Sequence, residues 1–226
     1  MTMLPLAAHP SPNFGPRKLG QLPDMVVLHY TAMPTCAEAH DRLCDPAAEV
    51  SAHYLISEQG AVMALVPEEL RAWHAGAGGW GGCRDVNSRS IGIELANPGD
   101  APFAEPQMRA LEGLLADVLA RWQIAPERVI AHSDMAPGRK GDPGPRFDWR
   151  RLALQGLSVW PEPGEPGDFA ADLARAGYPA APADVLLAAF RLRFRPWARG
   201  ALDDTDRALA AGLAARFPVD AARPAA

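Results

Sequence analysis

The sequence predicts an α/β fold in which a mixed central sheet is flanked by helices and followed by a small C-terminal three-helix domain. Three observations support this prediction. Short apolar runs alternate with helical patterns through residue 157, a segment rich in proline and glycine follows, and only helical patterns come after it. With 226 residues, 48% of them hydrophobic and 22% charged, the chain is long enough for one ordinary domain and a smaller one.

Five apolar runs are expected to form the sheet. The run MVVLHY has the length and composition of a buried strand, and two later runs are separated by a short turn at residues 58–60, as expected for an antiparallel pair. The predicted strands cover residues 25–30, 51–57, 61–66, 90–95 and 128–132.

Two helices are expected between the strands. Thr35, with Glu38 three residues later, fits a capping box at the start of a short helix that Pro46 ends. Pro106 lies in the first turn of a longer helix. Apolar residues recur there at spacings of three and four, which predicts one stripe packed on the sheet: Met108, Leu111, Leu115, Val118 and Trp122.

The remainder of the chain predicts a linker and a helical domain. Residues 158–167 are rich in proline and glycine and lack periodicity, which is typical of a linker. We therefore expect an α/β domain at 1–157, large enough to carry a catalytic site, followed by the linker at 158–167 and a small helical domain at 168–226. The three helices are expected at about 169–176, 184–195 and 205–217, with a core of Leu186, Leu187, Phe190, Phe194, Leu209, Leu213 and Phe217.

Composition limits the possible partners and the location. A net charge of −5 argues against binding nucleic acid over a broad face. No apolar run approaches a membrane span, and the first residues lack the pattern of a secretory signal. Cys36, Cys44 and Cys83 cannot all pair within the chain, which favours a reducing compartment. The cytoplasm is the expected location, and the sequence does not indicate an oligomeric state.

Two histidines and an aspartate are candidate metal ligands. His29 and His132 each end a predicted strand, and Asp142 lies ten residues beyond His132. Active groups of α/β domains often lie just outside the carboxyl ends of strands. Two histidines and a carboxylate also form the ligand set of catalytic zinc sites, where zinc lowers the pKa of bound water from about 15.7 towards 7. A packed or hydrogen-bonded histidine at a strand end remains an alternative, because this long-range spacing is weakly specific.

Glu94 and Lys140 are candidate catalytic groups near those ligands. Strand alternation places Glu94 on one face between Gly92 and Ala96, which leaves room above the carboxylate. If that face is covered, burial raises the pKa of Glu94 and suits it to be a general base; otherwise it is a solvent-facing residue. Lys140 stands two residues before Asp142, so an extended segment would direct both into one pocket, where the ammonium would stabilise an oxyanion. The alternative is a solvated surface lysine.

Several blocks of the sequence resemble one enzyme family. LHYTA around His29, SAHYLI around His53, AWHAG around His74, SIGIELAN around Glu94 and AHSDMAPGRKGDPGPRFDW from Ala131 are similar to the zinc-dependent N-acetylmuramoyl-L-alanine amidases of the AmpD and AmiD type. That family shares its fold with phage lysozyme amidases and peptidoglycan recognition proteins. The similarity runs in order from about residue 25 to residue 157, and the HSDxAPGRKxDPG string is highly specific.

The resemblance implies a zinc enzyme with defined catalytic roles. His29, His132 and Asp142 would bind one Zn²⁺. Glu94 would act as general base and proton shuttle, and Lys140 would support the oxyanion. The bond cut would be the amide between the lactyl group of N-acetylmuramic acid, in intact or 1,6-anhydro form, and L-alanine of the stem peptide.

Other positions match the family near the substrate. Trp73, His74 and Asn87 correspond to residues beside the substrate groove, so they are the expected substrate-binding residues. His53 would support the site rather than bind zinc. Arg84 is displaced from the arginine that would bind the stem peptide, so that contact is not assigned.

The C-terminal patterns resemble the helical domain that follows the amidase in the AmiD subgroup, which is related to peptidoglycan-binding modules. The aromatic residues there would form either a glycan-stacking surface or a core beside solvated arginines. The residues concerned are Phe190, Phe194 and Trp197, with Arg191, Arg193, Arg195 and Arg199.

The expected partners are muropeptides or peptidoglycan fragments. A non-catalytic peptidoglycan-binding module is the rival interpretation, but it requires the loss of a zinc ligand, and all the candidate ligands are present. The AmiD-like tail makes the periplasm or envelope the alternative location, with intact wall fragments as substrate instead of recycled anhydro-muropeptides.

Overall fold

The structure, a computed structural model, describes residues 10–219. Two terminal segments lie outside the described residues. They are residues 1–9, where a signal was looked for in the sequence, and residues 220–226, at the end of the predicted helical domain. A five-stranded sheet has the order β4-β3-β6-β2-β7, and two further strands, β1 and β5, form a small sheet. The strands are β1 Phe14–Pro16, β2 Met25–Tyr30, β3 Tyr54–Ile56, β4 Val62–Ala64, β5 Leu70–Ala72, β6 Ser90–Leu95 and β7 Val129–Ala131.

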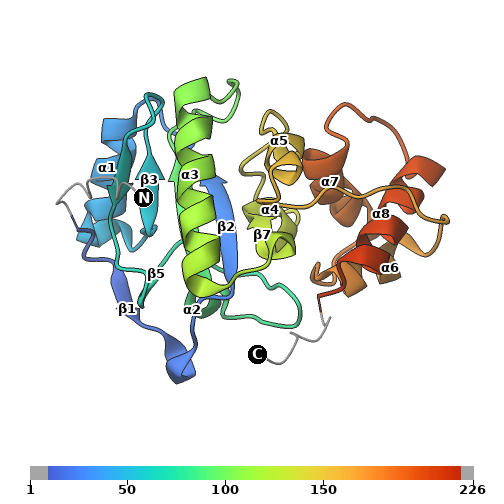
Figure 1. Ribbon diagram of the computed structural model, residues 1–226, viewed down its shortest axis with the longest axis horizontal. Helices are drawn as coiled ribbons and strands as arrows, with labels where there is room; N and C mark the ends of the chain where they lie inside the picture. The colour runs from blue at the N-terminus through green and yellow to red at the C-terminus, as the bar shows by residue number, and fades with distance from the viewer. Residues whose placement is uncertain (1–9, 220–226) are drawn as a thin grey trace.

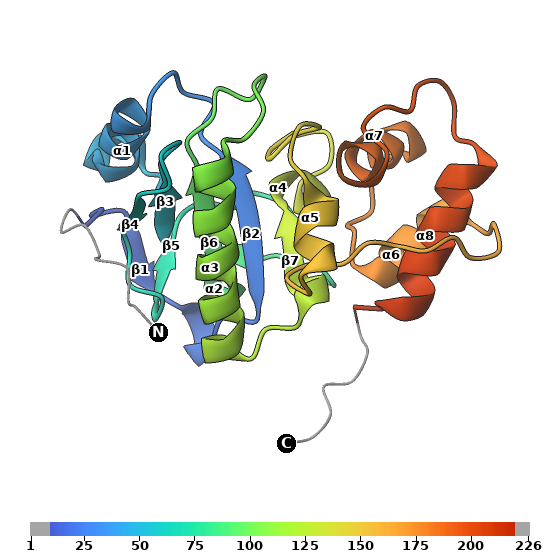
Figure 2. The same ribbon diagram turned by 45° about the horizontal axis from the view of Figure 1, so that its top comes forward.

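Helices pack around this sheet in two groups. α3 lies across one face of the sheet, while α6, α7 and α8 gather beyond β7, at the opposite end of the molecule from α1 (Figures 1 and 2). The α-helices are α1 Cys36–Cys44, α2 Val86–Arg89, α3 Glu105–Trp122, α4 His132–Met135, α5 Trp149–Leu154, α6 Phe169–Ala176, α7 Ala183–Phe194 and α8 Asp204–Arg216. Short 3-10 helices cover Lys18–Gly20, Pro46–Ala48 and Pro126–Arg128.

The helices start where their capping residues predict. The Thr35 hydroxyl accepts the backbone N–H of Glu38 at 3.2 Å, which satisfies a free donor at the start of α1. Pro106 occupies the first turn of α3, where its missing N–H costs no hydrogen bond. The predicted stripe of α3 is buried against the β6 face that carries Ile91 and Ile93, and only its last member, Trp122, is partly exposed.

The sheet is mixed, as predicted. β2 pairs in parallel with both β6 and β7, β3 pairs in parallel with β6, and β4 runs antiparallel to β3. β2 and β6 have the predicted bounds, whereas β3 and β4 are shorter than predicted. β7 ends at Ala131, so His132 begins α4 instead of ending the strand. The carboxylate of Asp134 accepts the Ala131 N–H at 2.9 Å, which starts a helical turn there.

The three C-terminal helices form as predicted, but their core is continuous with the sheet. Leu186, Phe190 and Leu213 are buried in one cluster that also contains Met25 and Val27 of β2. The face of β2 opposite α3 therefore packs against the tail. The boundaries at residues 157 and 168 remain a prediction.

Two of the aromatic residues of α7 belong to that core. Phe190 and Phe194 are fully buried, while Trp197 is exposed. The neighbouring Arg191 and Arg193 are buried in ion pairs with Asp206 and Asp134, so these two arginines are not solvated, as one of the two alternatives had them.

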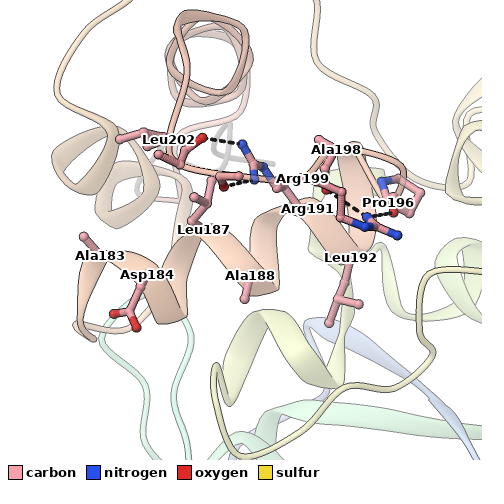
Figure 3. Close-up of a pocket in the computed structure, with 12 residues that line it drawn as sticks. Ala183, Asp184, Leu187, Ala188, Arg191, Leu192, Pro196, Ala198, Arg199 and Leu202 are labelled. Carbon is pink, nitrogen blue, oxygen red and sulfur yellow. Dashed lines mark hydrogen bonds between the residues drawn. The ribbon is translucent and has the colours of Figure 1, made fainter.

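A cavity of about 580 Å³ lies between α7 and the loop that follows it (Figure 3). The guanidinium of Arg191 donates to the carbonyls of Gly200 and Ala201 at 2.7 and 2.9 Å, and Arg199 donates to the carbonyls of Pro196 and Ala198. Both guanidinium groups thus stabilise the loop by donating hydrogen bonds to its backbone carbonyls.

The described helices include none that is both long enough and apolar enough to cross a membrane.

Candidate metal centre

The register of two parallel strands creates the site. His29 of β2 lies opposite Glu94 of β6, and both side chains emerge on the face away from α3. The next strand, β7, leads directly into His132. Because the three strands run in parallel, their carboxyl ends meet at one edge, and residues far apart in sequence come together there.

Three side-chain atoms converge at this edge. Nδ1 of His29, Nδ1 of His132 and Oδ2 of Asp142 form a triangle in which each pair is 2.9 Å apart. All three residues are buried, and together they are the group of His, Cys, Asp or Glu side chains among residues 10–219 that could hold a metal ion. Donors around a tetrahedral zinc at 2.0–2.1 Å would be separated by roughly 3.3 Å. The observed triangle fits such a site with small adjustments.

Two of the three groups, His29 and Asp142, are held in the protonation states that a metal requires. Burial, together with the neighbouring His132, lowers the pKa of His29 to about 4. Burial pushes the pKa of Asp142 upward, but His132 and His29, whose Nδ1 atoms lie 2.9 Å from its Oδ2, outweigh it, so this pKa lies well below its ordinary value. A neutral imidazole and an ionised carboxylate are the forms that coordinate metal ions.

In each histidine, the ring nitrogen that points away from the triangle, Nε2, has a hydrogen-bond partner. Nε2 of His132 donates to the Ala75 carbonyl at 2.8 Å, which leaves the lone pair on its Nδ1. Nε2 of His29 meets Nδ1 of His74 at 3.0 Å, and Nε2 of His74 meets the hydroxyl of Ser90 at 3.0 Å.

The Ser90 hydroxyl sets the direction of this chain. It donates to the Val86 carbonyl at 2.7 Å, so it accepts from Nε2–H of His74. Nδ1 of His74 then accepts from Nε2–H of His29. The lone pair of His29 is therefore on Nδ1, toward His132 and Asp142. Such partners fix the tautomer and the orientation of a metal-binding histidine.

A cavity of about 770 Å³ opens over the three ligands. Glu94, Lys140 and Trp73 line it. Oε2 of Glu94 is buried without a hydrogen-bond partner within the described residues. Burial, with a contribution from the charge of Asp142, raises the pKa of Glu94 to about 8. Glu94 and Lys140 thus line the same cavity as the three candidate ligands, as predicted. The side chain of Lys140 is exposed to solvent.

The expected substrate-binding residues differ in position, because Trp73 and His74 line the cavity whereas Asn87 does not. His74 lines the cavity, but its ring also lies over Gly92 and fills the space predicted there, since a Cβ at Gly92 would come within 2.4 Å of the ring. Asn87 is buried behind the cavity wall, where its side-chain oxygen accepts the N–H groups of His74 and Ala75 at 3.1 and 2.8 Å. It holds the segment that carries both hydrogen-bond partners of the ligands.

His53 is fully buried and outside the ligand triangle. Its Nδ1 accepts the N–H of Gly92 at 2.9 Å, so it supports the strand that carries Glu94. Arg84, whose contact was left unassigned, is exposed and does not line the cavity.

Two arginines at the cavity were missed by the sequence interpretation. Arg139 donates to the Ala75 carbonyl at 2.6 Å, and its place next to Lys140 was the available signal. Arg42 reaches the cavity from α1, more than fifty residues from the other lining groups on β6. No sequence motif connects it to the site, because only the packing of α1 brings it there.

Comparison with known proteins identifies the family. Residues 19–145 match the family described as N-acetylmuramoyl-L-alanine amidase. Over 87% of this chain and 84% of its relative, the sequence is 36% identical to the N-acetylmuramoyl-L-alanine amidase AmiD of Escherichia coli. The chain belongs to the N-acetylmuramoyl-L-alanine amidase family. It is a hydrolase of the amide between the lactyl group of N-acetylmuramic acid and L-alanine, as the resemblance implied.

Solved structures extend the similarity to the tail of the amidase. E. coli AmiD in complex with anhydro-N-acetylmuramic acid-L-Ala-D-γ-Glu-L-Lys matches with a TM-score of 0.78 and 35% identity, covering 94% of this chain and 93% of that one. AmpDh3 of Pseudomonas aeruginosa with anhydromuramic pentapeptide also has a TM-score of 0.78, at 31% identity and 96% and 100% coverage. The prediction of the fold, including the C-terminal helices, is confirmed.

We predict that Ser90→Ala weakens metal binding by about 10- to 100-fold, the usual effect of losing such a supporting partner. Without the hydroxyl, His74 loses the acceptor that orients it, and Nδ1 of His29 is no longer kept free of a proton. Competition with a chromophoric chelator measures the affinity. Ser88→Ala is the matched control, because Ser88 is equally buried but bonds to Asp85. Equal affinities for Ser90→Ala and the unaltered protein would contradict the chain of hydrogen bonds.

Proposed function

We propose that the amidase is zinc-dependent, with one Zn²⁺ held by His29, His132 and Asp142. The observation that carries this proposal is the triangle of Nδ1 of His29, Nδ1 of His132 and Oδ2 of Asp142, which lines a cavity beside a buried carboxylate oxygen that has no partner within the described residues. When bound in such a site, zinc polarises an amide carbonyl and makes a water molecule available as a nucleophile near neutral pH.

In this proposal Glu94 transfers the proton. Its Oε2 has no hydrogen-bond partner in the described protein, so it is free to accept a proton from water and pass it to the departing L-alanine nitrogen. Its raised pKa of about 8 matches a group that both takes up and releases a proton near neutrality. A divalent cation at the three ligands opposes this shift, because positive charge stabilises a carboxylate.

Lys140 stabilises the negative oxygen that develops during attack. Its ammonium is in the loop that ends in Asp142, and it lines the same cavity as Glu94. Within residues 10–219 its side chain has no ion-pair partner, so its charge is available to the substrate.

The proposed substrates are muropeptides, with the stem peptide lying in the cavity. AmiD and AmpDh3, which resemble this chain over nearly its full length, have been solved with anhydromuramic peptides. The cavity offers the indole of Trp73 for packing and the exposed guanidinium of Arg42 for a peptide carboxylate. Arg42 lacks an ion-pair partner among the described residues, which supports this role.

We propose that the amidase acts in the cytoplasm on recycled anhydro-muropeptides. None of its three cysteines forms a disulfide, as expected for a reducing compartment. AmpD relatives are named as 1,6-anhydro-N-acetylmuramyl-L-alanine amidases. The envelope, where polymeric wall is available, is the competing location.

Metal removal is expected to abolish cleavage, and added zinc to restore it. Purified protein is incubated with anhydro-muropeptide with and without a chelator, and L-Ala-headed peptides are followed by mass spectrometry. Asp142→Ala should bind less zinc and lose activity, while Asp117→Ala, on the exposed side of α3, should retain both. Full activity in the metal-free protein would contradict the zinc proposal. Absence of cleavage with zinc would favour the rival role of a binding module.

Glu94→Gln is expected to reduce kcat by about 10²- to 10⁴-fold, the usual contribution of a proton-transfer group. The amide cannot exchange the proton but has nearly the same shape as the carboxyl. The zinc content of the variant, measured by mass spectrometry of the metal, should stay equal to that of the unaltered protein. A variant with unchanged kcat would exclude Glu94 as the proton carrier.

The cytoplasmic proposal predicts that activity of the native protein fractionates with cytoplasmic markers and that anhydro-muropeptides are cleaved faster than polymeric sacculi. Both measurements use the full chain from its own cells. Activity confined to the envelope fraction, with sacculi as the better substrate, would reverse the assignment.

A further inference from the structure

A buried ion pair joins the C-terminal helices to the turn that carries His132. Asp134 of α4 is 0% exposed and Arg193 of α7 is 4% exposed. Nη1 of Arg193 donates to Oδ2 of Asp134 at 2.5 Å, and the hydroxyl of Tyr178 donates to Oδ1 at 2.6 Å. Both side-chain donors to this carboxylate therefore come from the tail.

The same carboxylate determines the path of the backbone at the metal ligand. Oδ2 of Asp134 also accepts the N–H of Ala131 at 2.9 Å. This hydrogen bond closes a turn that contains His132, the proposed metal ligand. Within this turn, the N–H of Ser133 donates to the carbonyl of Asp142 at 3.0 Å. Asp134 thus holds the turn that contains His132, and Ser133 of the same turn bonds the backbone of Asp142, the other proposed ligand.

Arg193 is itself fixed on three further sides. Its Nη2 donates to the carbonyl of Val129 in β7 and to the hydroxyl of Ser158, both at 3.1 Å. Its guanidinium lies over the ring of Trp149, 4.1 Å from the centroid. One tail residue therefore spans the start of β7 and the turn that follows its end.

Because this network is buried, removing any one of its side chains leaves a partner without its hydrogen bond. A buried ion pair adds little net stability compared with a well-packed apolar contact, and its better-supported role is to select one geometry. Here the geometry selected is that of the His132 turn. The cluster that surrounds it, including Met135 and Phe194, is the shared core of sheet and tail.

We propose that Arg193 and Tyr178 are positioning residues of the metal centre. The tail holds Asp134, and through it the backbone of His132, in the position needed for the metal. This proposal rests on the proposed ligand role of His132. The C-terminal helices are then part of the metal-binding unit in addition to any contact that they make with the wall.

The test compares three variants of the full chain. Tyr178→Phe removes only the hydroxyl, and Arg193→Lys keeps the charge but loses the second donor group. Arg191→Lys is the matched control, because Arg191 lies on the same helix (Figure 3) and pairs with buried Asp206 at 2.5 Å instead of with Asp134. Zinc affinity is measured by chelator competition, and melting temperature is measured on the metal-free proteins.

We expect Tyr178→Phe and Arg193→Lys to bind zinc about tenfold or more weakly. Arg191→Lys should retain the affinity of the unaltered protein, even where it melts at a lower temperature. Amide hydrogen exchange at residues 131–135 should accelerate in the first two metal-free variants only. At saturating zinc, the KM for anhydro-muropeptide should be unchanged, whereas a tail that acted only by binding glycan would alter KM.

The possible outcomes separate this proposal from the proposed function. If the unaltered protein binds no zinc, the ligand assignment fails and the positioning role fails with it. If the unaltered protein binds zinc and Tyr178→Phe binds it equally well, with equal exchange at residues 131–135, the positioning role alone is overturned. Should Arg193→Lys fail to fold, Tyr178→Phe still decides, because it removes one oxygen from an otherwise intact core.

Discussion

The parallel pairing of β2 with β6 is the constraint on which the site depends. It places His29 opposite Glu94 on one face, while Leu28 and Ile93 face α3 on the other. A slip of β2 by one residue would turn His29 into the apolar layer beneath α3 and away from Glu94. The burial of aliphatic side chains under α3 therefore also sets the orientation of the polar groups on the opposite face.

Two neighbouring carboxyl groups acquire opposite properties in this site. Oδ2 of Asp142 lies 2.9 Å from Nδ1 of each of two histidines, which keep its pKa low and the group ionised. Glu94 is buried without a partner and faces the charge of Asp142, so its pKa is raised to about 8. Such divergence supports the proposed roles of one carboxylate in metal binding and of the other in proton transfer. The difference lies in the polar neighbours of each group, since both side chains have the same chemistry.

Each histidine of the triangle depends on a group behind it. The Ala75 carbonyl holds His132, and the chain from His74 through Ser90 to Val86 holds His29. These supports come from the segment around residue 74 and the start of β6, while the turn of His132 is held from the tail through Asp134. Sheet, loop and C-terminal helices thus all contribute to one arrangement of three atoms, which explains why their apolar residues form a shared core.

The sequence by itself determined the local structure and the candidate chemistry. Strand length, strand alternation and capping residues were sufficient for β2, β6, α1 and α3, because these depend on neighbours in the chain. The HSDxAPGRKxDPG string was sufficient for the family. The tertiary structure decided what depends on distant contacts: the triangle formed by His29, His132 and Asp142, the place of Asn87 behind the wall, and the arrival of Arg42 from α1. It also decided that Arg193 is buried, since the charged partner that makes its burial possible lies 59 residues away.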